Sequence, residues 1–240
     1  MKKQLALFAL AAAAVLLPSA ARAQLDPGWM DWKEVHTTVG VRFWHTEWTT
    51  WYDTNVYRPA PTENAIIPVA SVRYKNFLLA GSYMVEHDFT FPDLATFSRK
   101  EYDVNFGYFL LPGLAVTVGY KHLEYSGGAA GYNWTTKGAT VGLTGSAPIS
   151  PHVSVYGNMA VGRPKLNDGG AFNNVKGKYF LTELGLAFPL GAMSDSLGGL
   201  LVTAGYRYQR VGAVPSNPIF EPVDNYEYTQ GPVLGISYAF

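Results

Sequence analysis

The sequence contains no cysteine at all. A chain without thiols cannot form disulfides, cannot carry a lipid on a cysteine at a signal cleavage site, and cannot ligate a metal ion through thiolate. These three ways of anchoring or cross-linking an exported protein are therefore excluded together.

Long apolar runs are also scarce, and the one that occurs lies at the N-terminus. Lys2 and Lys3 precede an apolar stretch from Leu5 to Leu17, which is followed by Ala21-Arg22-Ala23. This order predicts an export signal, residues 1–23, that is cleaved after Ala23. The apolar stretch is too short to span a bilayer, and no later segment supplies about 18 consecutive apolar residues. We therefore expect no transmembrane helix.

The chain lacks an excess of positive charge. Once residues 1–23 are removed, 15 Lys and Arg stand against 18 Asp and Glu, so the remaining 217 residues carry a net charge of −3. A protein that binds nucleic-acid phosphates would show clustered Lys and Arg, whereas these charges are interspersed singly along the sequence. We expect no nucleic-acid partner.

What the chain has in quantity is aromatic side chains, at 15%, and glycine, with 25 residues. From Asn225 to Phe240, large side chains alternate with small ones. The large set is Tyr226, Tyr228, Pro232, Leu234, Ile236, Tyr238 and Phe240, and the small set is Gly231, Val233, Gly235, Ser237 and Ala239. This period of two predicts a strand with lipid on one side and a crowded lumen on the other.

Turn signals divide the rest of the mature chain into similar segments, giving about ten strands. We place them at Val35–Trp48, Ala65–Tyr74, Phe77–His87, Arg99–Leu110, Leu114–Tyr125, Trp134–Ser146, Val153–Arg163, Lys178–Phe188, Leu200–Arg210 and Asn225–Phe240. Short connections alternate with longer polar ones. The sequence therefore predicts an all-β fold, a closed antiparallel up-and-down transmembrane β-barrel over residues 35–240, with eight strands as the alternative count. Residues 24–34 are expected to form a periplasmic N-terminal segment.

In its export signal, strand pattern and terminal Phe240, the mature chain resembles the small Gram-negative outer-membrane β-barrels of the OmpA, OmpX and OmpW type. The resemblance implies a porin-like protein of the outer membrane of a Gram-negative bacterium. It further implies that Phe240 is an assembly signal, presented by the C-terminal strand to the barrel-assembly machinery. Outer-membrane lipids and lipopolysaccharide are the partners that this location implies.

Strand parity predicts which charged side chains face the lumen. Four cations and four anions are expected to point inward: Arg42, Arg73, Glu86, Glu101, Asp103, Lys121, Glu183 and Arg207. A three-residue turn centred on Pro112 sets Asp103 opposite Lys121. Five of the eight, namely Arg42, Asp103, Lys121, Glu183 and Arg207, should form one layer at mid-height.

Because a barrel of about eight strands is filled by its own side chains, these charges should pair into a plug. The alternative is that they line an ion-selective or gated narrow pore.

Aromatic side chains are expected where the apolar band meets water on each side of the membrane. The periplasmic girdle should contain Tyr74, Phe77, Phe188, Tyr238 and Phe240. The outer girdle should contain Trp48, Trp51, Tyr52, Tyr102, Tyr125, Trp134, Tyr206 and Tyr226. Trp29 and Trp32, which precede the first strand, are expected at the periplasmic interface or in the barrel mouth.

Catalytic residues are hard to find. His122, Glu124 and Ser126 share one face of a strand near the outer rim, which suggests a lipid-facing hydrolase similar to outer-membrane lipid A deacylases. The compact His-x-Ser motif of that family is absent, and so are the acidic and histidine pairs of the omptin proteases. We expect no catalytic site, no cofactor and no metal site.

The leading functional hypothesis is therefore a non-enzymatic outer-membrane barrel, either structural or a narrow conduit for small solutes, with a salt-bridged lumen and aromatic-rich surface loops. A surface adhesion or ligand-binding barrel is the second hypothesis, since residues 48–52 could present aromatic faces outward. A lipid A-modifying hydrolase is the third. The sequence names no solute and no surface partner.

Overall fold

The computed structural model describes residues 35–53, 56–91, 95–127, 132–167, 174–213 and 225–240. The predicted export signal, the segment 24–34 with Trp29 and Trp32, and parts of several outer connections lie outside the described residues. So do the side chains of Trp51 and Tyr52.

The described residues form strands and two short 3-10 helices. The strands are β1 (Val35–Asp53), β2 (Val56–Pro59), β3 (Glu63–Tyr74), β4 (Phe77–Phe91), β5 (Ala95–Leu111), β6 (Leu114–Gly127), β7 (Tyr132–Ser150), β8 (Val153–Gly162), β9 (Lys165–Asn167), β10 (Val175–Pro189), β11 (Leu200–Ala213) and β12 (Asn225–Ala239). The helices η2 (Leu190–Ala192) and η3 (Asp195–Leu197) connect β10 to β11. No helix in the described part of the chain is long and apolar enough to cross a bilayer.

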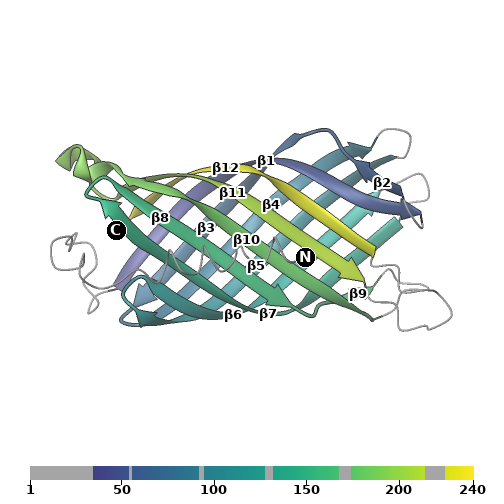
Figure 1. The fold of residues 1–240 in the computed structure, drawn as a ribbon, viewed down its shortest axis with the longest axis horizontal. Coiled ribbons are helices and arrows are strands. Elements are labelled where there is room, and N and C mark those ends of the chain that lie inside the picture. Colours follow the sequence, from purple (N-terminus) through teal and green to yellow (C-terminus); the bar gives the residue numbers. More distant parts are fainter. Residues whose placement is uncertain (1–34, 54–55, 92–94, 128–131, 168–173, 214–224) are drawn as a thin grey trace.

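Ten of the strands close into a ring in which all neighbours are antiparallel. Figure 1 shows the resulting barrel from the side. Going round the ring, the order is β1, β3, β4, β5, β6, β7, β8, β10, β11 and β12, and β12 pairs with β1 to close it. The short strand β2 pairs with β1, and β9 lies between β7 and β10 beyond the end of β8. The predicted ten-stranded up-and-down barrel is confirmed, and each predicted range falls on one strand of the ring.

Two of the turns at one end of the barrel contain only two residues each. Tyr74 pairs directly with Phe77, so Lys75 and Asn76 form a two-residue hairpin turn in which Lys75 has a φ of 52°. The turn between β5 and β6 pairs Leu111 with Leu114, so it contains two residues where three were predicted. A one-residue shift of the pairing at Leu110 then restores the register that sets Asp103 against Lys121. The predicted pairing of these two residues is confirmed.

The barrel is apolar on the outside and mixed on the inside, which is the reverse of a soluble protein. Val104, Val118 and Leu234 are each more than half exposed on the outer face. Lys121 and Glu183 are almost fully buried in the lumen. In water this surface would expose a wide apolar belt, so an outer surface of this kind requires lipid around it.

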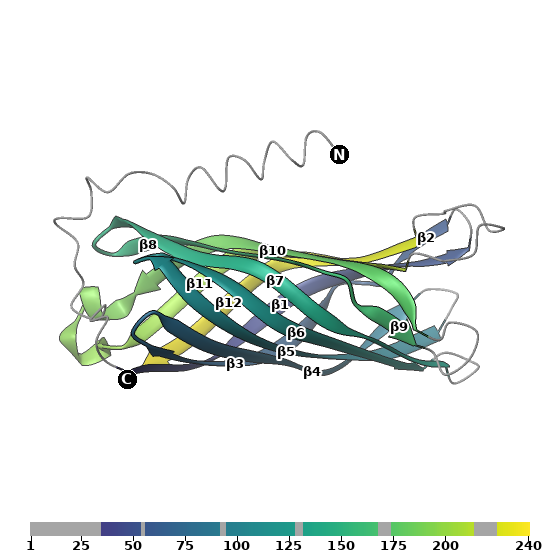
Figure 2. The ribbon, with the colours of Figure 1, turned by 90° about the horizontal axis from the view of Figure 1, so that it is seen from below.

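Several strands run further toward the end remote from the C-terminus than the sequence suggested. β4 continues to Phe91 and β5 begins at Ala95, several residues beyond the predicted limits on each strand. Figure 2 shows the paired strands reaching well toward this end of the barrel. In an outer-membrane barrel this is the outer end, because the C-terminus lies on the periplasmic side.

Candidate functional site in the barrel lumen

A buried carboxylate from β10 holds two arginines at mid-height in the lumen. Glu183 accepts hydrogen bonds from Nη1 of Arg42 at 3.1 and 3.2 Å, one to each oxygen. Arg207, on β11, lies with its Nη1 3.5 Å from the other side of the same group, at Oε2. Glu183 and Arg207 are directly paired across β10 and β11, whereas Arg42 reaches them from β1. The charge of Glu183 is therefore compensated from two directions.

A second cluster forms on the opposite side of the lumen, from β5 and β6. Nζ of Lys121 lies 2.6 Å from Glu101 and 3.5 Å from Asp103. Arg99 pairs with the other oxygen of Glu101 and donates a hydrogen bond of 2.5 Å to Oγ1 of Thr229, on β12. Arg99, Glu101 and Lys121 are almost fully buried. Since an unpaired buried ion would cost several kcal/mol, this degree of pairing is what allows these charges to occupy the lumen.

Gln209 of β11 joins the two clusters. Its Nε2 donates to Oε1 of Glu101 at 3.0 Å, while its Oε1 accepts a longer hydrogen bond of 3.4 Å from Arg207. Side chains from five strands are thereby connected into one ion network. We use this name for Arg42, Arg99, Glu101, Asp103, Lys121, Glu183, Arg207 and Gln209.

Aromatic side chains fill the lumen on the outer side of the ion network. Trp48 is completely buried, and its ring contacts Phe89, Phe91 and Tyr125 at centroid distances of 5.2, 5.0 and 5.5 Å. Tyr125 in turn stacks on Trp134 at 4.7 Å. We call this group, with Phe97, the aromatic cap. The guanidinium of Arg99 lies 5.4 Å from the rings of both Trp48 and Tyr125, so the cap rests directly on the ion network.

A polar cavity of about 310 Å³ occupies the other half of the lumen. Arg42, Asp103 and Arg207 reach it from the ion network. Below them the lining mixes apolar side chains, such as Val69, Leu78 and Leu201, with small polar ones. The polar set is Thr38, Ser71, Ser82, Asn105, Thr117, Thr144, Asn158, Thr203 and Ser237. From the periplasmic side inward, the lumen thus contains this cavity, then paired charges, then packed aromatic rings.

The structure brings together six of the eight lumen charges named from the sequence. Arg42, Asp103, Lys121, Glu183 and Arg207 meet in the predicted layer, and Glu101 joins them. The remaining two do not belong to the network. Arg73 lies near the periplasmic turn, with its guanidinium 4.1 Å from the ring of Phe109 and its Nε 3.2 Å from the carbonyl of Lys75.

The prediction that Glu86 faces the lumen is wrong, because a β-bulge interrupts β4. Met84 pairs with Glu101 and His87 pairs with Arg99, so Val85 and Glu86 both stand opposite the single residue Lys100. The extra residue exposes Glu86 on the outer face and returns Phe89 to the lumen.

The predicted aromatic girdles are also correct for some residues and wrong for others. Tyr74, Tyr102, Tyr206 and Tyr238 are exposed on the outer surface, and Phe188 is half-buried on that face. Trp48, Trp134 and Tyr125 do not belong to the outer girdle, because they pack inside the lumen as the aromatic cap. The side chain of Trp51 lies outside the described residues.

Sequence reasoning missed Arg99, Gln209 and Glu227, which accepts a hydrogen bond from Tyr125. Parity could have found all three. Glu227 shares a face with Gly231 and Val233, which belong to the small set on the lumen side. Arg99 is two positions from Glu101, and Gln209 is two from Arg207, so each shares a face with a residue already assigned to the lumen.

The hydrolase hypothesis concerns the outer surface instead. Nε2 of His122 lies 3.3 Å from Glu124, but Glu124 also pairs with Nζ of Lys100 at 2.7 Å. Ser126 is four strand positions from His122, or about 13 Å, which is too far for a proton relay.

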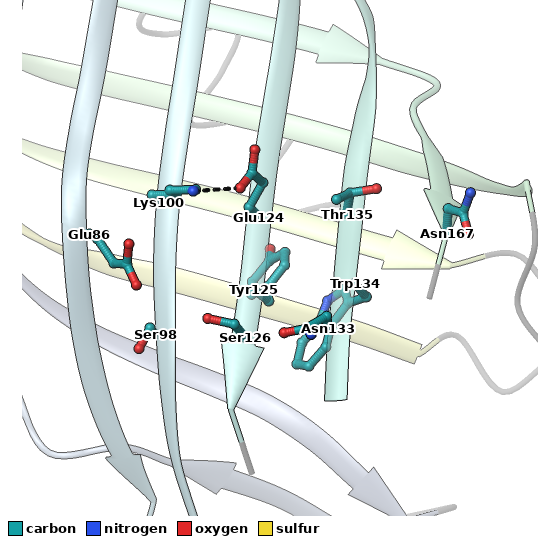
Figure 3. A pocket seen from close by; sticks show the side chains of 10 residues that line it. All are labelled: Glu86, Ser98, Lys100, Glu124, Tyr125, Ser126, Asn133, Trp134, Thr135 and Asn167. Carbon is teal, nitrogen blue, oxygen red and sulfur yellow. Dashed lines mark ion pairs between the residues drawn. The ribbon is translucent and has the colours of Figure 1, made fainter. Parts of the chain in front are cut away.

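A pocket of about 430 Å³ adjoins this area. It is lined by Glu86, Ser98, Lys100, Glu124, Tyr125, Ser126, Asn133, Trp134, Thr135 and Asn167 (Figure 3). His122 is not among its lining residues. Within the described ranges, no three His, Asp or Glu side chains gather closely enough to hold a metal ion.

Comparison with known proteins places the architecture. No family model matches the sequence, and no curated protein matches it either. Among solved structures, the chain is similar to the outer membrane protease OmpT from Escherichia coli, with 11% identity, a TM-score of 0.50, and 86% of this chain and 96% of that chain covered. It is also similar to Neisserial surface protein A, with 11% identity, a TM-score of 0.42, and coverage of 86% and 97%. At such identities the likeness concerns the fold, which is that of an outer-membrane β-barrel.

Proposed function

We infer that this outer-membrane β-barrel is a non-enzymatic envelope protein whose lumen is closed in its resting state. The observation that carries this proposal is the arrangement of two obstructions in series: the ion network at mid-height and the aromatic cap directly above it. Each of them brings buried side chains from several strands into the lumen. A permanently open pore requires a continuous water-filled path, and packing of this kind opposes such a path.

A second candidate is a gated narrow conduit for small polar solutes, and the polar cavity favours it. A purely structural barrel has no need for a cavity of about 310 Å³ whose lining includes many hydroxyl and amide groups. In this variant of the proposal, solutes enter the cavity from the periplasmic side, and rearrangement of the ion network and the aromatic cap opens the path.

Conductance across a planar bilayer tests the closed lumen. The wild-type protein should give no steady ion current. A variant that truncates both obstructions, Trp48→Ala combined with Arg207→Ala, should conduct, while each single variant should remain silent or nearly so. A steady current through the wild-type barrel contradicts the closed-lumen proposal, whereas transient openings of an otherwise silent barrel favour the gated conduit.

The adhesion hypothesis loses Trp48, which lies in the lumen. It rests on Trp51 and Tyr52, whose side chains lie outside the described residues, and it stays a hypothesis.

The role of Phe240 in assembly remains a proposal with structural support. Its N–H donates to the carbonyl of Thr37 at 3.0 Å, and its own carbonyl accepts from Thr37 at the same distance, so it extends the pairing of β12 with β1. Its side chain is exposed and stacks on Tyr238, in the position where an assembly partner could contact it.

A further inference from the structure

Five cationic side chains gather on the outer face of the barrel, on β7, β9, β10 and the residue that follows β8. We call them the basic patch: Lys137, Arg163, Lys165, Lys176 and Lys178. All five are exposed. They are scattered over 42 positions of the sequence, so the patch is not visible as a cluster of positive charge in the sequence.

Strand register brings three of these lysines into one row. Lys137 of β7 pairs directly with Lys165 of β9, and Lys165 pairs directly with Lys176 of β10. Directly paired residues project from the same face of a sheet with about 5 Å between their Cβ atoms. Arg163 and Lys178 each lie two positions from a member of this row, so they project from that same face.

The row points away from the lumen. The residues that alternate with it are turned inward: Thr136, beside Lys137, and Tyr179, beside Lys178, are both buried. The basic patch therefore lies on the outer wall of the barrel.

Nothing in the described part of the chain neutralises this charge, since none of the five cations forms an ion pair there. The neighbouring surface differs. Lys100, on β5, lies 2.7 Å from Glu124 and is therefore paired. Like charges placed directly opposite each other in a sheet are destabilising. An external anion bound to the row of three lysines would therefore relieve their repulsion.

The position of the basic patch indicates where this anion comes from. On the same strands, nearer the middle of the barrel, Val141, Val161 and Leu184 are exposed to lipid. The basic patch begins where this apolar surface ends, and β9 lies at the end of the barrel remote from the C-terminus (Figures 1 and 2). In an outer-membrane barrel that level is occupied by the headgroups of the outer leaflet.

We propose that the basic patch is a binding site for the phosphate groups of lipopolysaccharide, so that this lipid docks on the wall formed by β7, β9 and β10. The proposal rests on the placement of the barrel in the outer membrane and is independent of whether the lumen conducts. Charge complementarity selects the phosphate-bearing headgroup, and the adjoining apolar wall receives the acyl chains.

The test compares two lysine variants of the detergent-solubilised barrel. The triple variant Lys137→Gln/Lys165→Gln/Lys176→Gln removes the row, and Lys100→Gln removes a paired lysine from the same outer region. Binding of purified lipopolysaccharide is measured by native mass spectrometry. We expect the triple variant to bind at least about tenfold more weakly than wild type, and Lys100→Gln to bind like wild type.

Three further measurements test whether the phosphate groups of the lipid are what the basic patch recognises. Replacement of the same three lysines by arginine should retain binding, whereas lipopolysaccharide stripped of its phosphates should bind weakly to every form. Inorganic phosphate should not displace the intact lipid at matched concentration. Equal binding by wild type and the triple glutamine variant overturns the proposal, as does undiminished binding of the stripped lipid or displacement by inorganic phosphate. Heat-modifiable gel migration of each variant shows that the barrel itself has folded.

Discussion

Arg42 and Glu183 lie 141 positions apart in the sequence and on strands that do not pair, yet they form a two-oxygen contact at 3.1 and 3.2 Å. Two strands, β11 and β12, separate them along the wall of the barrel. The contact therefore crosses the lumen and connects β10 directly to β1. The seam where β12 pairs with β1 lies between these two strands.

Replacement of Glu183 by glutamine should destabilise the barrel by about 3 kcal/mol, since breaking a buried pair by removing one partner leaves an uncompensated charge behind. Here Arg207 is almost fully buried and would lose its anion, whereas Arg42 is partly exposed and can turn to water in the cavity. The measurement is unfolding of the purified barrel in detergent by denaturant. Glu63→Gln is the control, because its contact with His87, at 3.7 Å, is longer and the Glu63 side chain is 39% exposed. Equal losses in the two variants would contradict a special contribution of Glu183.

Trp48→Ala should also destabilise the protein, by about 3–5 kcal/mol, because it leaves a large cavity at the centre of the aromatic cap. Phe43→Ala provides a matched comparison: it removes an aromatic ring from the same strand, but from the lipid-facing side, where Phe43 is 48% exposed. Thermal unfolding followed by the heat-modifiable gel shift should rank Trp48→Ala well below Phe43→Ala. The opposite ranking would show that the cap contributes little.

Gly231→Ala should disturb the closing seam. Gly231 has a φ of 155°, and a Cβ built on it would lie 1.9 Å from the carbonyl oxygen of His45 on β1. The backbone of β1 would have to move away, so we expect a lower yield of folded barrel after refolding from urea. At Gly81 the nearest atom to an added Cβ is 3.5 Å away, and Gly81→Ala should refold like wild type.

His122→Ala should leave lipid A unchanged. Glu124 is shared between His122 and Lys100, and Ser126 is far beyond hydrogen-bond reach, so the three residues cannot act as a catalytic unit. Mass spectrometry of lipid A from cells that express wild type or His122→Ala is the measurement. A species present with wild type and missing with the variant would revive the hydrolase hypothesis.

The ten strands could be predicted because side-chain alternation and turn residues are local properties of the sequence. The same parity rule also placed Asp103 opposite Lys121. It would have placed Trp48 correctly too, since Trp48 is six positions from Arg42 and an even spacing on a regular strand keeps the same face. The outer-girdle assignments of Trp48, Tyr125 and Trp134 failed because they relied on height along the strand in place of parity.

Other features could not be predicted from parity. The bulge that turns Glu86 outward depends on how β4 and β5 twist against each other, and no residue at Val85 or Glu86 marks it. The contact between Gln209 and Glu101 joins β11 to β5 across the lumen, so it depends on the diameter and stagger of the closed barrel. The basic patch likewise exists only after β7, β9 and β10 have aligned.

Strand length has a consequence at the cell surface. β1 and β7 each contain 19 residues, so at about 3.3 Å per residue and a tilt of about 40° they rise to nearly twice the height of an apolar band of about 25 Å. Much of what projects into the medium is consequently backbone held in a ladder. An extracellular protease must wait for these hydrogen-bonded strands to separate before it can cut, so the strand pairing itself protects the barrel against degradation.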